Sequence, residues 1–136
     1  MKDEEIRSML GRCKTIAVVG ISSKEDRPSY TVASYLKSKG YTIIPVRPDG
    51  ETILGEKVYH SLQDIPPEVN IDIVDIFRKS EDVPPAVEEA IQRKARVVWM
   101  QEGVIHPEAA ARAERAGLQV VMDRCIKKDH QRLFKT

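Results

Sequence analysis

Short apolar runs alternate with amphipathic stretches along this chain, and this alternation constrains the fold more than any other feature. The first run, 15–20, is rich in β-branched residues, is apolar on both faces and ends in glycine. Runs of this kind are typical of strands buried on both sides of a parallel sheet. The same pattern predicts strands at 41–46, 71–77, 97–100 and 118–122. Pro45 lacks an N–H, so we expect it near the end of its strand.

Helix signals fill the spaces between these runs. Helices are expected at 4–12, from Ser29 to Gly40, at 80–94, at 107–116 and at 123–134. We expect Ser29 to cap its helix and Gly40 to end it. The segment 47–69 is more irregular, with a short strand expected at 57–59 and a helical turn at 62–65. Strand–helix alternation implies right-handed βαβ units. The predicted fold is therefore a Rossmann-like α/β three-layer sandwich with a parallel sheet of about five strands.

Length and charge limit the classes of function. A chain of 136 residues is expected to form a single domain, 1–136. Its net charge of +1 argues against nucleic-acid and membrane partners. The N-terminus has no apolar signal segment, and Cys13 and Cys125 stand alone, so we expect a cytoplasmic protein with reduced thiols. An anionic ligand must then be held by a local group of donors.

The loop after the first strand is the best candidate for such a group. Rossmann-type sheets bind ligands beyond the carboxyl ends of their strands. Hydroxyl donors and the cations Lys24 and Arg27 follow the first strand, and the next helix adds free N–H groups. The dinucleotide fingerprint GxGxxG is absent except for its first glycine. We predict phosphate contacts from this loop, and the alternative is a polar surface loop. The residues assigned to it are Gly20, Ile21, Ser22, Ser23, Arg27 and Ser29.

The later strand ends supply further candidates. Arg47 stands where an NAD site would carry an acidic residue, and it suits a ribose that bears an extra phosphate, as in NADP or coenzyme A (CoA). Alternatively, it is a solvated surface arginine. Phe77 can pack on an adenine or belong to the core, and Arg78 lies beside it. Gln101 and Gly103 are expected at the ligand edge.

Motifs for catalysis are missing from the sequence. The histidines are isolated, and no GxSxG, HExxH or Walker pattern occurs. Cys125 is a possible nucleophile, but a small buried thiol is the favoured interpretation. Asp72 and Asp75 interrupt an apolar strand without an evident role.

The strand ends together resemble the family of small CoA-binding proteins. The matching segments, which extend over about 16–130, are IAVVG (16–20), RPS (27–29), GY (40–41), IPV (44–46), IFR (76–78), VWMQ (98–101), AGL (116–118) and VMDRC (121–125). Each segment is common alone, whereas the combination is specific. The family is similar to the CoA-binding domain of the succinyl-CoA synthetase α chain.

This resemblance implies a Rossmann-like domain with CoA lying over the strand ends. The first loop would hold phosphates. The residues bordering the nucleotide would be Pro45, Val46, Arg47, Ile76, Phe77 and Arg78, with Gln101 and Gly103 closing the rim. Relatives often carry asparagine in place of Arg47. The synthetases also use a phosphorylated histidine and a nucleotide-grasp partner, and we expect this chain to lack both.

The function expected from the sequence is binding of CoA or acyl-CoA, as a carrier, a sensor or a partner subunit. We expect a binding module rather than an enzyme, with CoA as its cofactor and an unidentified protein as a possible partner. The alternatives are an NADP-dependent oxidoreductase and a nucleotide-sensing regulator.

Overall fold

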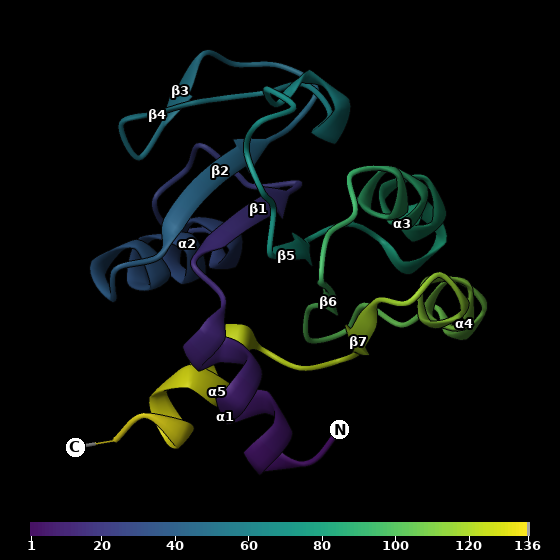
Figure 1. The fold of residues 1–136 in the computed structure, drawn as a ribbon. Helices are drawn as coiled ribbons and strands as arrows, with labels where there is room; N and C mark the ends of the chain where they lie inside the picture. The colour runs from purple at the N-terminus through teal and green to yellow at the C-terminus, as the bar shows by residue number, and fades with distance from the viewer. Residues whose placement is uncertain (136) are drawn as a thin grey trace.

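A five-stranded parallel sheet forms the centre of the computed structural model, which describes residues 1–135 (Figure 1). Its strands, in chain order, are β1 (Thr15–Val19), β2 (Thr42–Val46), β5 (Ile73–Ile76), β6 (Val97–Met100) and β7 (Gln119–Val121). Every neighbouring pair is parallel. The predicted α/β sandwich is confirmed, and the strand boundaries differ by at most two residues from those expected.

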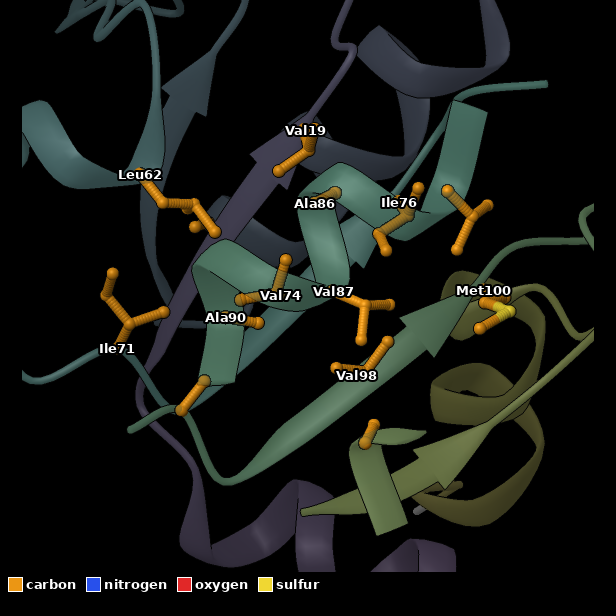
Figure 2. Close-up of a cluster of buried hydrophobic side chains, with 14 of the residues drawn as sticks. Val19, Leu62, Ile71, Val74, Ile76, Ala86, Val87, Ala90, Val98 and Met100 are labelled. Atoms are coloured by element: carbon orange, nitrogen blue, oxygen red, sulfur yellow. The ribbon is translucent and has the colours of Figure 1, made fainter. Parts of the chain in front are cut away.

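Helices cover both faces of the sheet, as a three-layer sandwich requires (Figure 1). One face packs against α3 (Val83–Gln92) and α4 (Pro107–Arg115), and Figure 2 shows Val87 and Ala90 of α3 beside Val74 and Val98 of the strands. The other face packs against α1 (Asp3–Arg12), α2 (Pro28–Ser38) and α5 (Ile126–Leu133). Full burial of a valine side chain such as Val87 or Val98 stabilises the folded state by about 1.5–3 kcal/mol.

The strand order places a switch point between β1 and β5. The sheet runs β2-β1-β5-β6-β7, so the chain moves outward from β1 to β2 and then crosses back to β5 on the other side of β1. Loops that leave β1 and β5 at their carboxyl ends therefore diverge to opposite faces of the sheet. In doubly wound sheets, the crevice between such loops is where ligands bind.

The outer edge of β2 is paired with a loop residue. The Tyr59 N–H donates to the Pro45 carbonyl at 3.0 Å, and the Arg47 N–H donates to the Tyr59 carbonyl at 3.0 Å. The nitrogen of Pro45 lies on the same side as its carbonyl and so points away from β1, which explains why proline is tolerated there.

The short strand expected at 57–59 is found one residue earlier as the second strand of a small hairpin, and Tyr59 forms an isolated parallel bridge with Val46. Strands β3 (Thr52–Ile53) and β4 (Glu56–Lys57) pair antiparallel around Leu54 and Gly55, which both have positive φ. Positive φ at two consecutive loop residues is typical of a two-residue hairpin turn. The helical turn expected at 62–65 is present as a 3₁₀ turn, Leu62–Asp64.

Two helix starts differ from the prediction, and proline explains both. Helix α2 begins at Pro28 with Arg27 as its N-cap, so Ser29 lies in the first turn and is not the cap. The helix expected at 80–94 is a 3₁₀ turn, Ser80–Asp82, followed by α3 from Val83. Pro84 and Pro85 lack N–H groups, which an α-helix tolerates only in its first turn.

The closing helix is shorter than the expected 123–134. Asp123 has a φ of 60° and lies outside α5. Within residues 1–135, no helix is both long enough and apolar enough to cross a bilayer.

Candidate functional site

A cleft of about 750 Å³ lies at the carboxyl ends of the strands, across the switch point between β1 and β5. It is lined by the loop after β1, the start of α2, and the segments that follow β5, β6 and β7. The lining residues are Gly20, Ser22, Lys24, Arg27, Pro28, Ser29, Val32, Phe77, Arg78, Lys79, Gln101, Glu102, Val104 and Cys125.

The floor of the cleft depends on a close approach of two backbone segments. The N–H of Gly20 donates to the Val46 carbonyl at 2.8 Å, and the N–H of Phe77 donates to the Val19 carbonyl at 2.8 Å. Gly20 has a φ of 85°, and a Cβ built on it would overlap the Phe77 carbonyl oxygen. Only glycine combines a positive φ with the absence of a Cβ, so this backbone approach requires glycine at position 20 even though the rest of the GxGxxG fingerprint is absent.

Two serines hold the loop after β1 in shape. The Ser22 N–H donates to Ser29 Oγ at 2.8 Å, and the Lys24 N–H donates to Ser22 Oγ at 3.0 Å. Both hydroxyl oxygens accept from backbone N–H groups, so each hydroxyl keeps its own hydrogen for donation. Ser29 is buried, whereas Ser22 is half-buried beside the cleft.

The start of α2 favours an anion in the cleft. No side chain caps this helix, and its first turn holds Pro28 and no acidic residue. Pro28 has no N–H and the Tyr30 N–H donates to the Arg27 carbonyl at 3.0 Å, so the first turn presents the Ser29 N–H together with the partial positive charge of a helix N-terminus. The exposed Arg27 stands at its N-cap.

Positive charge is concentrated around the cleft. Its lining contains four cations (Lys24, Arg27, Arg78 and Lys79) and one acid, Glu102, whereas the whole chain carries a net charge of +1. Glu102 is itself paired with Lys128 at 3.0 Å. Because the net charge of the chain is near zero, an anionic ligand would need a local group of cations, and this cleft provides one.

The remainder of the lining is largely apolar. Val32 of α2, the half-buried Phe77 and Val104 contribute hydrocarbon surface. Gln101 is 4% exposed, and its Oε1 accepts from the Ile126 N–H at 3.2 Å. The cleft thus combines a cationic, hydroxyl-rich loop with an apolar channel.

The structure brings half of the expected site residues into the cleft. Those lining it are Gly20, Ser22, Arg27, Ser29, Phe77, Arg78 and Gln101. The others lie outside the lining: Ile21, Ser23, Pro45, Val46, Arg47, Ile76 and Gly103. Ile21, Val46 and Ile76 are at most 1% exposed, and their side chains belong to the hydrophobic core.

Arg47 connects β2 to the first loop. Its Nη1 donates to the Ile21 carbonyl at 3.3 Å, and its Nε pairs with Asp49 at 3.0 Å. Its side chain is 26% exposed, so it is neither the free surface arginine of one alternative nor a lining residue of the cleft.

Several lining residues were not assigned from the sequence. They are Lys24, which was named as a cation of the first loop but not assigned to the site, and Pro28, Val32, Lys79, Glu102, Val104 and Cys125. Cys125 was expected to be a buried thiol, but it is half-buried on the cleft. Its position at the end of the last strand was the signal that could have identified it, because all carboxyl strand ends meet at one edge.

Asp75 and His130 are among the titratable groups that have shifted pKa values and lie outside the lining. Burial raises the pKa of Asp75 well above its usual range, and neither carboxyl oxygen has a partner within residues 1–135. Burial, with a smaller contribution from Lys39, lowers the pKa of His130, whose Nδ1 lies 2.7 Å from the Tyr35 hydroxyl. No cluster of three or more potential metal ligands occurs within 1–135.

Comparison with known proteins assigns the family. A family model described as a CoA binding domain matches residues 14–131. The chain belongs to the CoA-binding domain family. This CoA-binding domain is 43% identical over 126 residues to the uncharacterized protein YneT of Bacillus subtilis, covering 93% of this chain and 92% of YneT.

Two further relatives place the CoA-binding domain in context. It is 32% identical over 111 residues to an ADP-forming acetate–CoA ligase of Archaeoglobus fulgidus, covering 79% of this chain but only 16% of the ligase. It superimposes with a TM-score of 0.95 on a hypothetical protein from Pyrococcus horikoshii, at 42% identity, covering 99% of this chain and 94% of that one. The family resemblance expected from the strand-end motifs is confirmed.

Proposed function

We propose that this protein binds CoA or acyl-CoA in the cleft at the carboxyl ends of its strands. The observation that carries the proposal is a single cleft that joins a cationic, serine-rich loop and an uncapped helix start to an apolar channel. CoA has matching parts: a diphosphate and a 3′-phosphate at one end, and a largely uncharged pantetheine arm at the other. Membership in the CoA-binding domain family supports the same ligand.

The first loop is the site proposed for the diphosphate. Ser22 and Ser29 each have a hydroxyl hydrogen to donate, and Arg27 and Lys24 supply charge. Phosphate oxygens bound in this way gain charge-assisted hydrogen bonds and the favourable field of the helix N-terminus. Phe77 is proposed to pack on the ligand between this loop and the apolar channel.

The residues that lie outside the lining keep narrower proposed roles. Ile21, Val46 and Ile76 can shape the strand ends from the core, while Ser23, Pro45 and Gly103 are proposed to lie near the bound ligand without lining the cleft. Arg47 is proposed to reach the 3′-phosphate of CoA from beside the loop. Its Nε and Nη1 are engaged by Asp49 and Ile21, so Nη2 is the atom proposed for that contact.

The role proposed for the protein is that of a carrier, a sensor or a partner subunit. The region that matches the acetate–CoA ligase covers 16% of that enzyme, so the ligase contains much beyond this domain. We propose that the protein by itself binds CoA or acyl-CoA but does not catalyse formation of the thioester. A protein partner would supply any further chemistry.

Isothermal titration of the purified protein with CoA, acetyl-CoA and NADP tests the proposal. We expect CoA and acetyl-CoA to bind at one site per chain and NADP to bind far more weakly. Native mass spectrometry of protein purified without added ligand gives an independent readout, since a co-purified CoA species is expected. Binding of NADP in preference to CoA would instead favour an oxidoreductase and would overturn the proposal.

A further inference from the structure

Two groups of cations lie at opposite ends of the sheet. The first lines the cleft at the carboxyl ends of the strands, where CoA is proposed to bind. The second lies at the amino ends, around the segments that lead into β1, β5 and β6. Within residues 1–135, three cations of the second group form no ion pair: Arg12, Lys14 and Lys94.

The second group lines a groove that runs along the amino ends of the strands. Two hollows of about 780 Å³ and about 300 Å³ form this groove, and they share Arg12 and Arg96. The larger hollow begins at Thr15 of β1, and the smaller one reaches Gln119 of β7. In the sheet, β1 and β7 are separated by β5 and β6, so the groove crosses three strand spacings, or about 14 Å.

Hydrogen bonds fix the shape of the groove. Oδ2 of Asp72 accepts from the N–H groups of Lys14 at 2.8 Å and Thr15 at 3.0 Å, which holds the start of β1 to the start of β5. The guanidinium of Arg93 donates to four backbone carbonyl groups, those of Leu62, Ile65, Pro66 and Val69. The groove is therefore formed before any partner binds, and Asp72 acquires a structural role that the sequence did not reveal.

The groove carries more positive charge than the fold requires. Its lining contains one acid, Asp72, which lies 3.6 Å from Arg96. The carboxyl ends of α1 and α3 also point here and supply about half a negative charge each. The cations of the larger hollow are Arg12, Lys14, Arg93, Lys94 and Arg96. About three positive charges thus remain without compensation.

An extended acidic peptide fits this groove better than a nucleic acid or a small anion. A segment of about four residues spans 14 Å in the extended conformation, and its side chains point alternately to opposite sides. Consecutive acidic residues would therefore reach Arg12 and Lys14 beyond α1 and Lys94 and Arg96 beyond α3. Neither hollow is lined by an aromatic residue on which a base could stack.

We propose that the groove at the amino ends of the strands is a docking surface for an extended, acidic segment of a partner protein. The proposal gives the partner-subunit role a defined surface and a partner of defined chemistry. It does not depend on the binding of CoA, because the cleft and the groove lie at opposite ends of the sheet. Both are open at the same time, so the protein can hold CoA while it is docked.

A fluorescence anisotropy titration with a synthetic peptide tests this surface. The probe is a fluorescein-labelled peptide of about six alternating aspartates and glutamates, and the control peptide has asparagines and glutamines in their place. At a salt concentration of about 50 mM, the acidic probe should bind at one site per chain and at least about tenfold more tightly than the neutral peptide. Absence of binding, or equal binding of the two peptides, would overturn the inference.

Lysine-to-glutamine variants locate the site of binding. Lys14→Gln and Lys94→Gln each remove an exposed cation of the groove. Each should raise the Kd of the acidic probe about two- to fivefold, and the double variant about four- to 25-fold, since exposed ion pairs contribute modestly and add when they are independent. Lys57→Gln, in the exposed part of the hairpin, changes the net charge equally and should leave the Kd within about 1.5-fold. Equal effects at all three lysines would show that only the overall charge matters and would overturn the inference.

Competition experiments separate the groove from the CoA cleft and from other classes of ligand. Saturating CoA should leave the Kd of the probe within about twofold, whereas displacement by CoA would place the probe in the cleft and overturn the inference. Tighter binding of oligothymidylate or inorganic triphosphate than of the probe would assign the groove to a nucleic acid or a small polyanion instead. Failure to bind CoA would overturn the proposed function alone, because the effects of Lys14→Gln and Lys94→Gln on the probe are measured without CoA.

Discussion

Gly20 and the carbonyl group of Phe77 lie so close together at the ends of β1 and β5 that a Cβ on Gly20 would overlap the Phe77 oxygen. Gly20→Ala must therefore displace backbone as well as adopt an unfavourable positive φ. We expect this variant to lose about 2–4 kcal/mol of unfolding free energy. Urea denaturation followed by circular dichroism measures the loss.

Gly40 provides a matched control for this prediction. Its φ is 97°, and nothing lies within 4 Å of a Cβ built on it. Gly40→Ala should lose only the conformational part, about 1–2 kcal/mol. Equal losses at the two positions would show that contact with Phe77 contributes nothing.

Arg27 is expected to contribute directly to the affinity for CoA. Arg27→Ala removes the cation at the N-cap of α2, and a charge-assisted hydrogen bond is worth about 1.5–3 kcal/mol. The Kd for CoA should rise by about 10- to 150-fold in isothermal titration. Arg115→Ala, at an exposed position of α4 outside the cleft, removes the same charge and should leave the Kd within about twofold. Unchanged binding by Arg27→Ala would mean that the diphosphate lies elsewhere.

Arg47 should distinguish CoA from dephospho-CoA. If its guanidinium meets the 3′-phosphate, Arg47→Ala weakens CoA by about tenfold or more and dephospho-CoA by less than about threefold. Asp49→Asn frees Arg47 from its ion pair and should strengthen the binding of CoA slightly. Equal weakening of both ligands would contradict the phosphate contact. It would indicate that Arg47 acts through its hydrogen bond to the Ile21 carbonyl.

Asp75 is expected to make stability fall as pH rises. Burial raises its pKa in the folded state, so the folded chain keeps a proton that the unfolded chain releases above the ordinary value of 3.8. The stability linked to this proton is complete below pH 3.8 and is lost as the pH rises through the folded-state pKa.

Asp75→Asn removes this titration while preserving shape. The unfolding free energy of the variant relative to wild type should grow with pH in that window, by up to about 1.4 kcal/mol per pH unit. Urea unfolding of both proteins at a series of pH values from pH 4 to pH 8, all above the ordinary value of 3.8, measures this difference. Parallel stability profiles for the two proteins would show that the carboxyl does not titrate as its burial implies.

The sheet was predictable because burial on both faces leaves a clear pattern. Strands such as β5 and β6 consist of apolar residues with few exceptions, and their neighbours along the chain carry helix signals. Helix starts were less predictable where two rules competed. At α3 the acidic residues Glu81 and Asp82 indicated a helix start at residue 80, but Pro84 and Pro85 must lie in the first turn, so the regular helix begins at Val83.

The candidate site was predictable where it is continuous in sequence. The loop from Gly20 to Ser29 follows a recognisable strand, and the fold places that loop at the ligand edge. Val32, Val104 and Cys125 reach the same cleft from three different elements, and only the assembled sheet brings them together. Ile21 was assigned to the site from the motif, although its side chain turns into the core.

The pairing of Tyr59 with the outer edge of β2 has a consequence for self-association. An open strand edge is a template on which another chain can add a strand, and exposed edges are common starting points of aggregation. Here Pro45 offers no N–H, its carbonyl is taken by Tyr59, and the Arg47 N–H is taken as well. Because the carboxyl half of this edge is closed in this way, the protein can carry an apolar strand such as β2 at the margin of its sheet with fewer backbone groups open to another molecule in a concentrated solution.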